Sequence, residues 1–258
     1  MMIKIGPAAL GPVKTAEQVL QEYHKKGFRA CEIAFTYSVY IKSKDDALRI
    51  GKKAKQLGID LSIHAPYFVN LNSAEKAKRE ATKQRILKCC DIGELLGAKR
   101  VVFHPGYYGK NKEEAYNAIK QGIKEMMEIK NKKGWKIKLA PETMGKVNVF
   151  GSVEEISRLV KDTGCDFCID FAHILARDKK VDYEKVKELF PQKEWHVHFS
   201  GIVYGDKGER HHRTTEKKEW EELLKNLPKN KDITIVNESP TLIEDCIEGL
   251  KIKSKLAI

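Results

Sequence analysis

Short apolar stretches alternate along the chain with longer amphipathic stretches that are rich in charge. In the longer stretches the apolar residues recur at helical spacing, whereas the short ones are typical of buried strands. This alternation predicts repeated βα units, which build a parallel sheet. We expect eight strands, at residues 3–6, 29–35, 59–64, 99–104, 136–142, 166–170, 194–199 and 233–238.

A helix is expected after each of these strands. The predicted helices span residues 16–27, 45–58, 74–97, 112–134, 153–164, 181–190, 218–227 and 242–257. Ser152 and Glu155 form a capping-box pattern at the start of one helix, and Gly97 ends another. Eight βα units in 258 residues predict an α/β fold of the (β/α)8 TIM-barrel type, with its active site at the carboxyl ends of the strands. No linker interrupts the series, so one domain is expected over residues 1–258.

Six of the predicted strands carry, at or near the carboxyl end, a residue type that binds metals well. These residues are His64, His104, Glu142, Asp170, His196 and Glu238. One such residue at a strand end is more often a structural hydrogen-bonding group than a ligand. Six of them around one barrel mouth would carry a heavy desolvation cost, which bound cations would offset. The pattern therefore predicts a metal centre at the carboxyl ends of the strands.

Two further pairs of residues extend this set of candidate ligands. His173 lies three residues after Asp170, and Glu209 lies two residues before His211 in a polar loop. The resulting five histidines and four carboxylates exceed one tetrahedral site, so two or three metal ions are expected, with one carboxylate bridging. Nitrogen and oxygen ligands without thiolate suit zinc, and manganese or iron are the alternatives.

Charge and composition narrow the class of protein. The formal net charge of +12 would attract polyanions such as nucleic acid, although a lysine-rich surface chosen for solubility explains it equally well. No stretch approaches the roughly 20 apolar residues of a membrane span, so we expect a soluble, cytoplasmic protein without membrane contact. The six cysteines are expected to be reduced core residues. Cys165 and Cys168 form a single CxxC motif with no second motif to complete a metal site. A zinc or redox role is therefore not favoured for them.

Seven short motifs follow one another along the whole chain. They are HAPYFVNL at 64–71, VFHPG at 102–106, PETMGK at 141–146, CIDFAH at 168–173, the histidine of WHVHFS at 196, ERH at 209–211 and NESP at 237–240. In this order they resemble the endonuclease IV family of apurinic/apyrimidinic endonucleases, which are TIM barrels with a trinuclear zinc cluster. The resemblance implies a hydrolase of base excision repair that cleaves the phosphodiester 5′ to abasic sites in double-stranded DNA.

Carried over by position, the resemblance implies three zinc ions. The three ligand sets would be His64 with His104 and Glu142; Glu142 with Asp170, His196 and Glu238; and His173 with Glu209 and His211. Glu142 would then bridge two ions. The family usually has Asp where this chain has Glu209, and its glycine-rich continuation is replaced here by residues 212–215. His198 follows His196 at strand spacing, so it would also face the mouth and could assist there, although we favour a supporting hydrogen bond from it.

The expected chemistry follows from the cations. They would neutralise a phosphodiester, make hydroxide from bound water at neutral pH and stabilise the leaving alkoxide. The hydroxide is expected near Glu142, with Glu238 helping to orient it, so these two carboxylates are the candidate catalytic residues. The resemblance implies that Tyr67 and Phe68 wedge into DNA, with packing against neighbouring loops as the alternative. Phosphate contacts are expected from Tyr107, Tyr108, Lys110, Arg210 and Arg213.

Two other functions fit parts of the pattern. A sugar isomerase or epimerase on the same barrel type would need one divalent metal, for which Glu142, Asp170, His196 and Glu238 suffice. That function leaves the remaining histidines unused. A DNA-binding or metal-storage protein without catalysis is the other alternative, and a complete ligand set with room for substrate argues against it. The protein is expected to act as a monomer.

Overall fold

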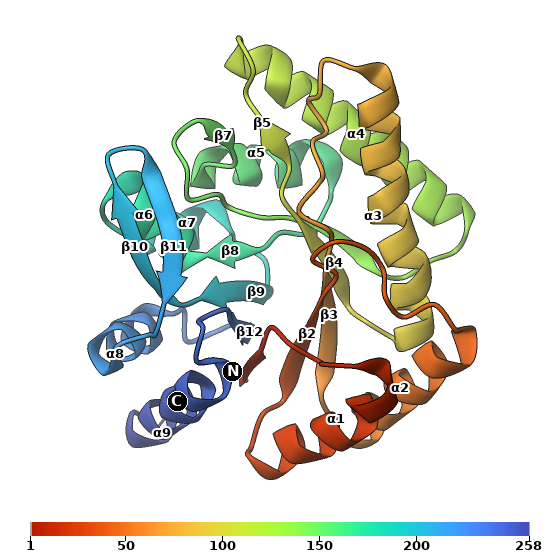
Figure 1. Ribbon diagram of the computed structural model, residues 1–258. Coiled ribbons are helices and arrows are strands. Elements are labelled where there is room, and N and C mark those ends of the chain that lie inside the picture. The colour runs from red at the N-terminus through yellow and green to blue at the C-terminus, as the bar shows by residue number, and fades with distance from the viewer. Residues whose placement is uncertain (1, 258) are drawn as a thin grey trace.

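The computed structural model describes residues 2–257 and has the predicted TIM-barrel fold (Figure 1). The barrel strands are β1 (Ile3–Pro7), β2 (Ala30–Ala34), β3 (Asp60–His64), β4 (Arg100–Phe103), β6 (Lys138–Pro141), β8 (Ile169–Asp170), β9 (Glu194–Phe199) and β12 (Asp232–Asn237). They form two four-stranded parallel sheets, ordered β1-β12-β9-β8 and β2-β3-β4-β6. The Arg29 amide donates to the Ile5 carbonyl, and Glu142 bridges to Cys168, so these two contacts join the sheets into a closed wall.

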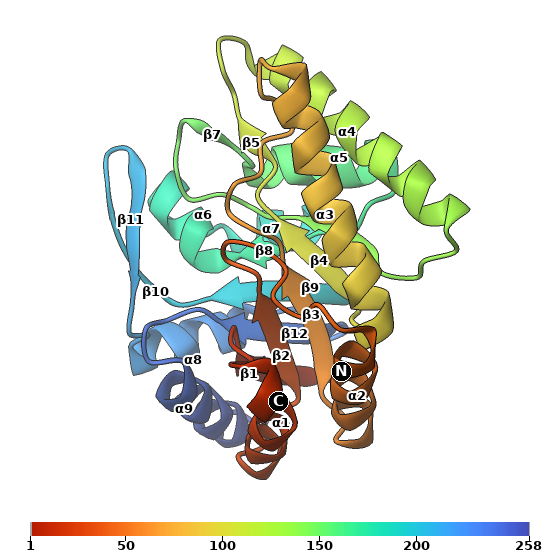
Figure 2. The same ribbon diagram turned by 45° about the vertical axis from the view of Figure 1, so that its right-hand side comes forward.

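The outer layer consists of helices that follow the strands in chain order (Figures 1 and 2). They are α1 (Ala16–Lys25), α2 (Lys44–Gln56), α3 (Lys76–Leu96), α4 (Lys112–Lys132), α5 (Val153–Thr163), α7 (Tyr183–Leu189), α8 (Lys217–Asn226) and α9 (Leu242–Lys255). The capping box of Ser152 and Glu155 is present at the start of α5. Gly97 ends α3 with a φ of 64°, a left-handed conformation that glycine adopts without strain.

Two elements near the mouth differ from the sequence-based expectation. Helix α6 (Phe171–Asp178) begins directly after β8, because the Asp170 side chain accepts a hydrogen bond from the His173 amide at 2.7 Å. The predicted polar loop after β9 is a hairpin of β10 (Gly201–Gly205) and β11 (Gly208–Arg213), which projects from the barrel beside α6 (Figure 2). Its second strand is polar on both faces, so it lacks the alternation that marks a strand in sequence.

Three short elements complete the described chain. A 3-10 turn, η1 (Val13–Thr15), precedes α1, and β5 (Gly106–Tyr107) pairs with β7 (Val149–Phe150) beside the mouth. All six cysteines are buried and reduced, as expected, and Cys165 and Cys168 pack in separate clusters. Within residues 2–257, no helix combines the length and the apolar character that a membrane crossing demands.

Gly6 is a test of how tightly the barrel closes. A Cβ atom on Gly6 would lie 1.7 Å from the Ala30 carbonyl oxygen, which belongs to the backbone of β2. Gly6→Ala is therefore expected to lower the free energy of unfolding by about 3 kcal/mol. Urea denaturation followed by circular dichroism measures this change.

Gly58→Ala is the matched control. Gly58 has a φ of +63°, and no atom lies within 4 Å of the position that an added methyl group would take, so only its left-handed conformation opposes the substitution. We expect a loss of about 1 kcal/mol. If Gly6→Ala and Gly58→Ala lowered the free energy of unfolding equally, this result would contradict the close approach of β1 and β2.

Candidate metal centre

Glu142 lies at the centre of the barrel mouth, directly after β6, and its side chain is fully buried. Its Oε2 atom lies 3.2 Å from Nε2 of His64 and 3.2 Å from Nε2 of His104. Its Oε1 atom lies 3.0 Å from Nδ1 of His198. Burial alone would raise the pKa of Glu142, but the charge of His198 and hydrogen bonds from His104 and His64 hold this pKa well below its usual range. An ionised carboxylate therefore faces three imidazole rings.

Glu142 also belongs to a second group, which contains Asp170, His198 and Glu238. One ligand atom from each of these four residues lies within 4.8 Å of the others. The Asp170 Oδ1 atom caps α6 through His173, whereas its Oδ2 atom is buried and accepts no hydrogen bond from any residue between 2 and 257. Burial raises the pKa of Asp170. Nδ1 of His173 lies 3.3 Å from this Oδ2 atom but pairs with the Thr143 carbonyl oxygen, so a cation would satisfy the orphaned oxygen.

A third group consists of His173, Glu209 and His212. Nε2 of His173 lies 3.5 Å from Oε2 of Glu209, and the rings of His173 and His212 are 5.4 Å apart. A side chain at Gly145 would fill this space, since its Cβ would lie 2.8 Å from Cβ of Glu209. Ser200 Oγ lies 2.6 Å from Nδ1 of His212 and orients that ring. Glycine at position 145 thus permits the group to assemble.

Backbone carbonyl groups fix the orientation of two rings. Nδ1 of His64 lies 2.8 Å from the Ala65 carbonyl oxygen, and Nδ1 of His173 lies 2.9 Å from the Thr143 carbonyl oxygen. A hydrogen on each Nδ1 donates to the carbonyl, which leaves Nε2 free as a ligand atom at the mouth. Burial alone would lower the pKa of His64, but Glu142 outweighs it and raises this pKa to about 9. The negative charge of Glu142 thus favours a positive charge at His64, which either a proton or a metal cation would supply.

The donor set fits divalent cations of the zinc class. All three groups offer imidazole nitrogen and carboxylate oxygen, which zinc accepts readily. Glu142 belongs to two of the groups, so its carboxylate is placed to be shared between two ions. The orphaned oxygen of Asp170 and the space left by Gly145 are the local features that make room for ions.

His198, and not His196, faces the centre, which corrects the sequence-based assignment. In β9 both side chains point into the barrel, but the register pairs His198 with Asp170 at the mouth. His196 lies two residues deeper, roughly 6.6 Å along the strand, and its Nε2 contacts Glu32 at 3.1 Å. Burial lowers the pKa of His196 to about 4, so its ring is neutral. The strand runs to Phe199, as predicted, so His198 and not His196 lies near its carboxyl end.

His212 replaces His211 in the third group for a different reason. The pairing of β10 with β11 shifts register between Val203 and Tyr204, so Arg210 is an extra residue in β11. Such a bulge reverses the alternation of side chains beyond it. Glu209 and His212 consequently share a face, whereas His211 is exposed to solvent. The ERH motif and the resemblance had paired Glu209 with His211.

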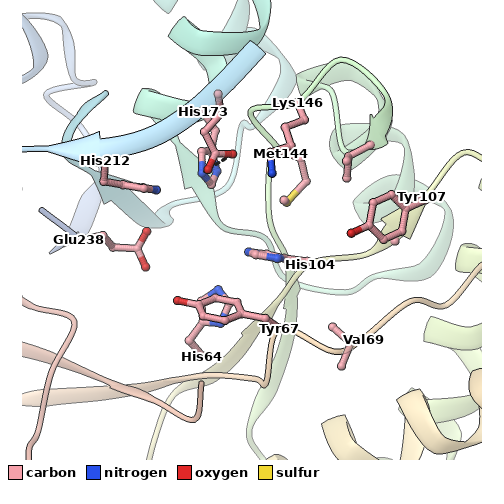
Figure 3. A pocket seen from close by; sticks show the side chains of 13 residues that line it. His64, Tyr67, Val69, His104, Tyr107, Met144, Lys146, His173, His212 and Glu238 are labelled. Carbon is pink, nitrogen blue, oxygen red and sulfur yellow. Dashed lines mark ion pairs between the residues drawn. The ribbon is translucent and has the colours of Figure 1, made fainter. Parts of the chain in front are cut away.

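Each of the three groups contributes residues to the wall of a cavity of about 340 Å³ (Figure 3). His64, His104, His173, His212 and Glu238 line it. Lys146 lines it as well and directs its amine into the space (Figure 3). This lysine was not among the candidates from sequence, although it is the last residue of the PETMGK motif. The cavity thus combines cation ligands with one positively charged side chain.

Aromatic side chains form part of the rim. Tyr67 is 52% exposed and its ring stacks on His104, with centroids 5.6 Å apart. Phe68 is 62% exposed. Tyr37, which was not among the candidates from sequence, is exposed and lies beside Phe68 with ring centroids 6.1 Å apart. Tyr107 is exposed and lines the cavity. These rings are accessible for stacking.

Two of the expected DNA-contacting residues have other partners. Tyr108 is buried, and its hydroxyl group donates to Glu155 and accepts from Arg177. The guanidinium group of Arg213 donates to both carboxylate oxygens of Glu219. Tyr108 and Arg213 are therefore no longer expected to contact DNA. Lys110 and Arg210 are both exposed and remain predicted contacts.

Glu32 is a further buried carboxylate that sequence reasoning missed. It lies within the apolar stretch of β2, between Cys31 and Ile33, and its side chain is fully buried. Burial alone would raise the pKa of Glu32, but His198 and His196 hold it well below its usual range. A carboxylate inside an otherwise apolar strand is the signal that could have identified it.

Comparison with known proteins identifies the fold family. The profile of the xylose isomerase-like TIM barrel family matches residues 20–252. The chain belongs to this family. Among its relatives, this xylose isomerase-like barrel is 34% identical to the uncharacterized protein MJ0133 of Methanocaldococcus jannaschii, over 99% of this chain and 98% of that protein. It is also 28% identical to a probable endonuclease 4 of Acholeplasma laidlawii, over 78% of this chain and 80% of that protein.

Solved structures of this xylose isomerase-like fold include nucleases and epimerases. SacUVDE superposes with a TM-score of 0.77 at 16% identity and covers 100% of this chain and 99% of its own. Endonuclease IV from Thermus thermophilus has a TM-score of 0.69 at 20% identity, over 98% and 99% of the two chains. D-psicose 3-epimerase has a TM-score of 0.65 at 18% identity, over 93% and 91%. At these identities the likeness establishes the fold alone.

Two adjacent histidines of this xylose isomerase-like barrel test the third group. His212→Ala is expected to weaken zinc binding there by at least about tenfold, because the group loses one of three ligand side chains. His211→Ala removes an exposed neighbour and is expected to leave the affinity unchanged. Competition with a chromophoric chelator measures both affinities. The opposite ranking would restore the sequence-based assignment of His211.

Proposed function

We propose that the chain is a metal-dependent endodeoxyribonuclease that cleaves the phosphodiester 5′ to an abasic site in double-stranded DNA. The observation that carries this proposal is the set of three adjoining ligand groups at one mouth, two of which share Glu142. One group of four residues would suffice for a single divalent ion. The additional histidines therefore favour a reaction that uses more than one cation.

Phosphodiester hydrolysis explains why such a centre would be needed. Bound divalent cations would neutralise the phosphate, activate water and stabilise the leaving oxygen. Glu142, Asp170 and Glu238 would hold these cations through carboxylate oxygens that lie close together. The amine of Lys146 faces the same cavity and would pair with a phosphate oxygen. Glu238 lies at the cavity wall, where its free oxygen would orient the attacking water.

The rim supports DNA as the substrate. Tyr67 and Phe68 are exposed beside the cavity, where a ring can occupy the space that a missing base leaves in the stack. Lys110 and Arg210 are exposed and would contact the phosphate backbone without reading sequence. The net charge of +12 favours a polyanion. The similarity to a protein named probable endonuclease 4 points to the same substrate class.

A sugar epimerase is the second candidate function. Glu142, Asp170, His198 and Glu238 form a compact group that would hold one divalent ion next to a small polyol. The structural likeness to D-psicose 3-epimerase is consistent with that reaction. His104 and the group around His173 would then have no role. The exposed rings of the rim would also be unexplained for so small a substrate.

Glu142→Gln tests the proposed chemistry. The amide keeps the size of the side chain but lacks the negative charge that two ligand groups share, so incision of a duplex with one abasic site is expected to fall by at least about a hundredfold. Denaturing gel electrophoresis of the end-labelled strand measures the rate. Glu113→Gln, which changes an exposed carboxylate on α4, is the matched control and is expected to retain full activity.

Metal content and activity of the wild-type protein distinguish the two candidate functions. Wild-type protein with more than one bound metal ion per chain and incision 5′ to the abasic site would support the nuclease. A single bound ion, no incision and turnover of a ketose would refute it in favour of the epimerase.

Phe68→Ala tests recognition separately from chemistry. Loss of an exposed ring that stacks in the duplex is expected to raise KM for abasic DNA about tenfold, with a smaller change in kcat. Leu48→Ala removes an exposed apolar side chain on α2 and should leave KM unchanged. Steady-state kinetics at fixed salt concentration provide both constants. An unchanged KM for Phe68→Ala would show that the ring does not contact DNA.

A further inference from the structure

A polar layer lies inside the barrel beneath the metal centre, and the proposed chemistry does not use it. It consists of Glu32 from β2, Ser62 from β3 and His196 from β9, all buried. None of these residues contacts the cavity at the mouth. A carboxylate enclosed in this way is costly unless other groups hydrogen-bond to it or balance its charge. The contacts of the Glu32 carboxylate therefore indicate which role this residue has in the structure.

Three neighbours hold the Glu32 carboxylate from two sides. The Ser62 hydroxyl donates to Oε2 at 2.7 Å, and Nε2 of His196 lies 3.1 Å from the same oxygen. The other oxygen, Oε1, lies 2.9 Å from Nε2 of His198, and neither atom forms a hydrogen bond within residues 2–257. Because Ser62 and His196 occupy one oxygen, the other is left for His198.

The His198 ring spans the distance between two layers of carboxylates. Its Nε2 atom lies beside Glu32 in the interior, as described above. Its Nδ1 atom lies 3.0 Å from Oε1 of Glu142 and 3.5 Å from Oε1 of Glu238 at the mouth. A neutral imidazole carries one hydrogen, so a hydrogen on Nε2 leaves a lone pair on Nδ1. Nδ1 is hydrogen-bonded to Glu142 in this structure; with a cation bound at Nδ1, the ring hydrogen would lie on Nε2, where Oε1 of Glu32 is the near acceptor.

We propose that Glu32 is a positioning residue that holds the hydrogen of His198 on Nε2, so that Nδ1 binds a cation together with Glu142, Asp170 and Glu238. The inference rests on the proposed function in that it assumes a metal ion at this mouth. A carboxylate that accepts from the outer nitrogen of a ligating histidine fixes the ring and makes the inner nitrogen a better ligand. Ser62 and His196 contribute by holding the carboxylate of Glu32 in place.

Glu32→Gln is the variant that tests this role. The amide has nearly the same size, but its NH2 group can donate to Nε2 of His198, which would move the ring hydrogen to Nδ1. The affinity for one zinc ion is then expected to fall about 10- to 100-fold. Competition against a chromophoric chelator measures the affinity and the number of ions, and neither requires DNA.

Asp245→Asn is the matched control. Asp245 is another buried carboxylate, which accepts hydrogen bonds from the Thr215 amide and the Thr241 hydroxyl group, away from the ligand groups. Its replacement is expected to reduce thermal stability without changing the affinity for zinc. An equal loss of zinc affinity in both variants would show that general destabilisation is the cause, and would overturn the proposal.

Ser62→Ala keeps the proposal testable if Glu32→Gln fails to fold. This variant removes only the hydroxyl group that donates to Oε2 of Glu32. Because the effect on the metal ligand is indirect, we expect the zinc affinity to fall only about two- to tenfold. Wild-type zinc affinity in folded Ser62→Ala would refute the positioning role.

Cobalt(II) provides a spectroscopic readout of the same site. Cys168 lies close to His196 and His198, so these three residues could form a different, thiolate-containing site in the interior. Substituted cobalt bound at the mouth would show visible bands without thiolate charge transfer, and Glu32→Gln is expected to change those bands. Intense near-ultraviolet charge transfer would place the ion on Cys168 and overturn the proposal.

These measurements also separate the inference from the function on which it rests. If wild-type protein binds zinc and Glu32→Gln weakens it, Glu32 has the positioning role even when abasic DNA is not incised. If abasic DNA is incised and Glu32→Gln binds zinc normally, the nuclease stands and the positioning role fails.

Discussion

The buried charge of Glu142 is the interaction on which the rest of this mouth depends. A carboxylate excluded from water is stable only when positive charge or hydrogen bonds surround it, and here three histidines do so. The TIM barrel makes this arrangement possible, because parallel strands bring residues far apart in sequence to the same edge. His64 and His198 lie in β3 and β9, and His104 directly follows β4, so the three rings reach Glu142 from different parts of the barrel.

The ligand groups and the aromatic rim belong to the same loops, which connects chemistry to recognition. Tyr67 follows His64 closely in the chain and stacks on His104, so the ring beside the cavity also packs against two ligand histidines. Lys146 follows Glu142 by four residues and faces the same cavity. A molecule that contacts the rim would therefore lie directly over the candidate metal ligands.

Residues deeper in the barrel orient the histidine rings at the mouth. Carbonyl groups orient the rings of His64 and His173, and Glu32 lies behind the ring of His198. Each partner occupies one ring nitrogen and leaves the other for the centre. Gly145 has a complementary role, since it leaves the space in which Glu209 approaches His173. The ligand groups are thus maintained by residues that are not ligands themselves.

Much of this arrangement could be predicted from the sequence. The alternation of apolar strands and amphipathic helices determined the barrel, because burial on one face imposes a period that is visible in the chain. The positions of His64, Glu142 and Asp170 at strand ends followed from the same pattern. The seven motifs added the resemblance to the endonuclease IV family, and the endonuclease-like relatives agree with it.

The remaining features depend on contacts between distant segments, which a periodic pattern does not encode. Strand register, and not strand identity, placed His198 at the mouth and His196 beside Glu32. A bulge in β11 exchanged His211 for His212. The sequence by itself thus determined the barrel and the kinds of ligand at its mouth, since both follow from local burial. Only the tertiary structure decided which side chains meet there, because register and depth arise when separate strands pack together.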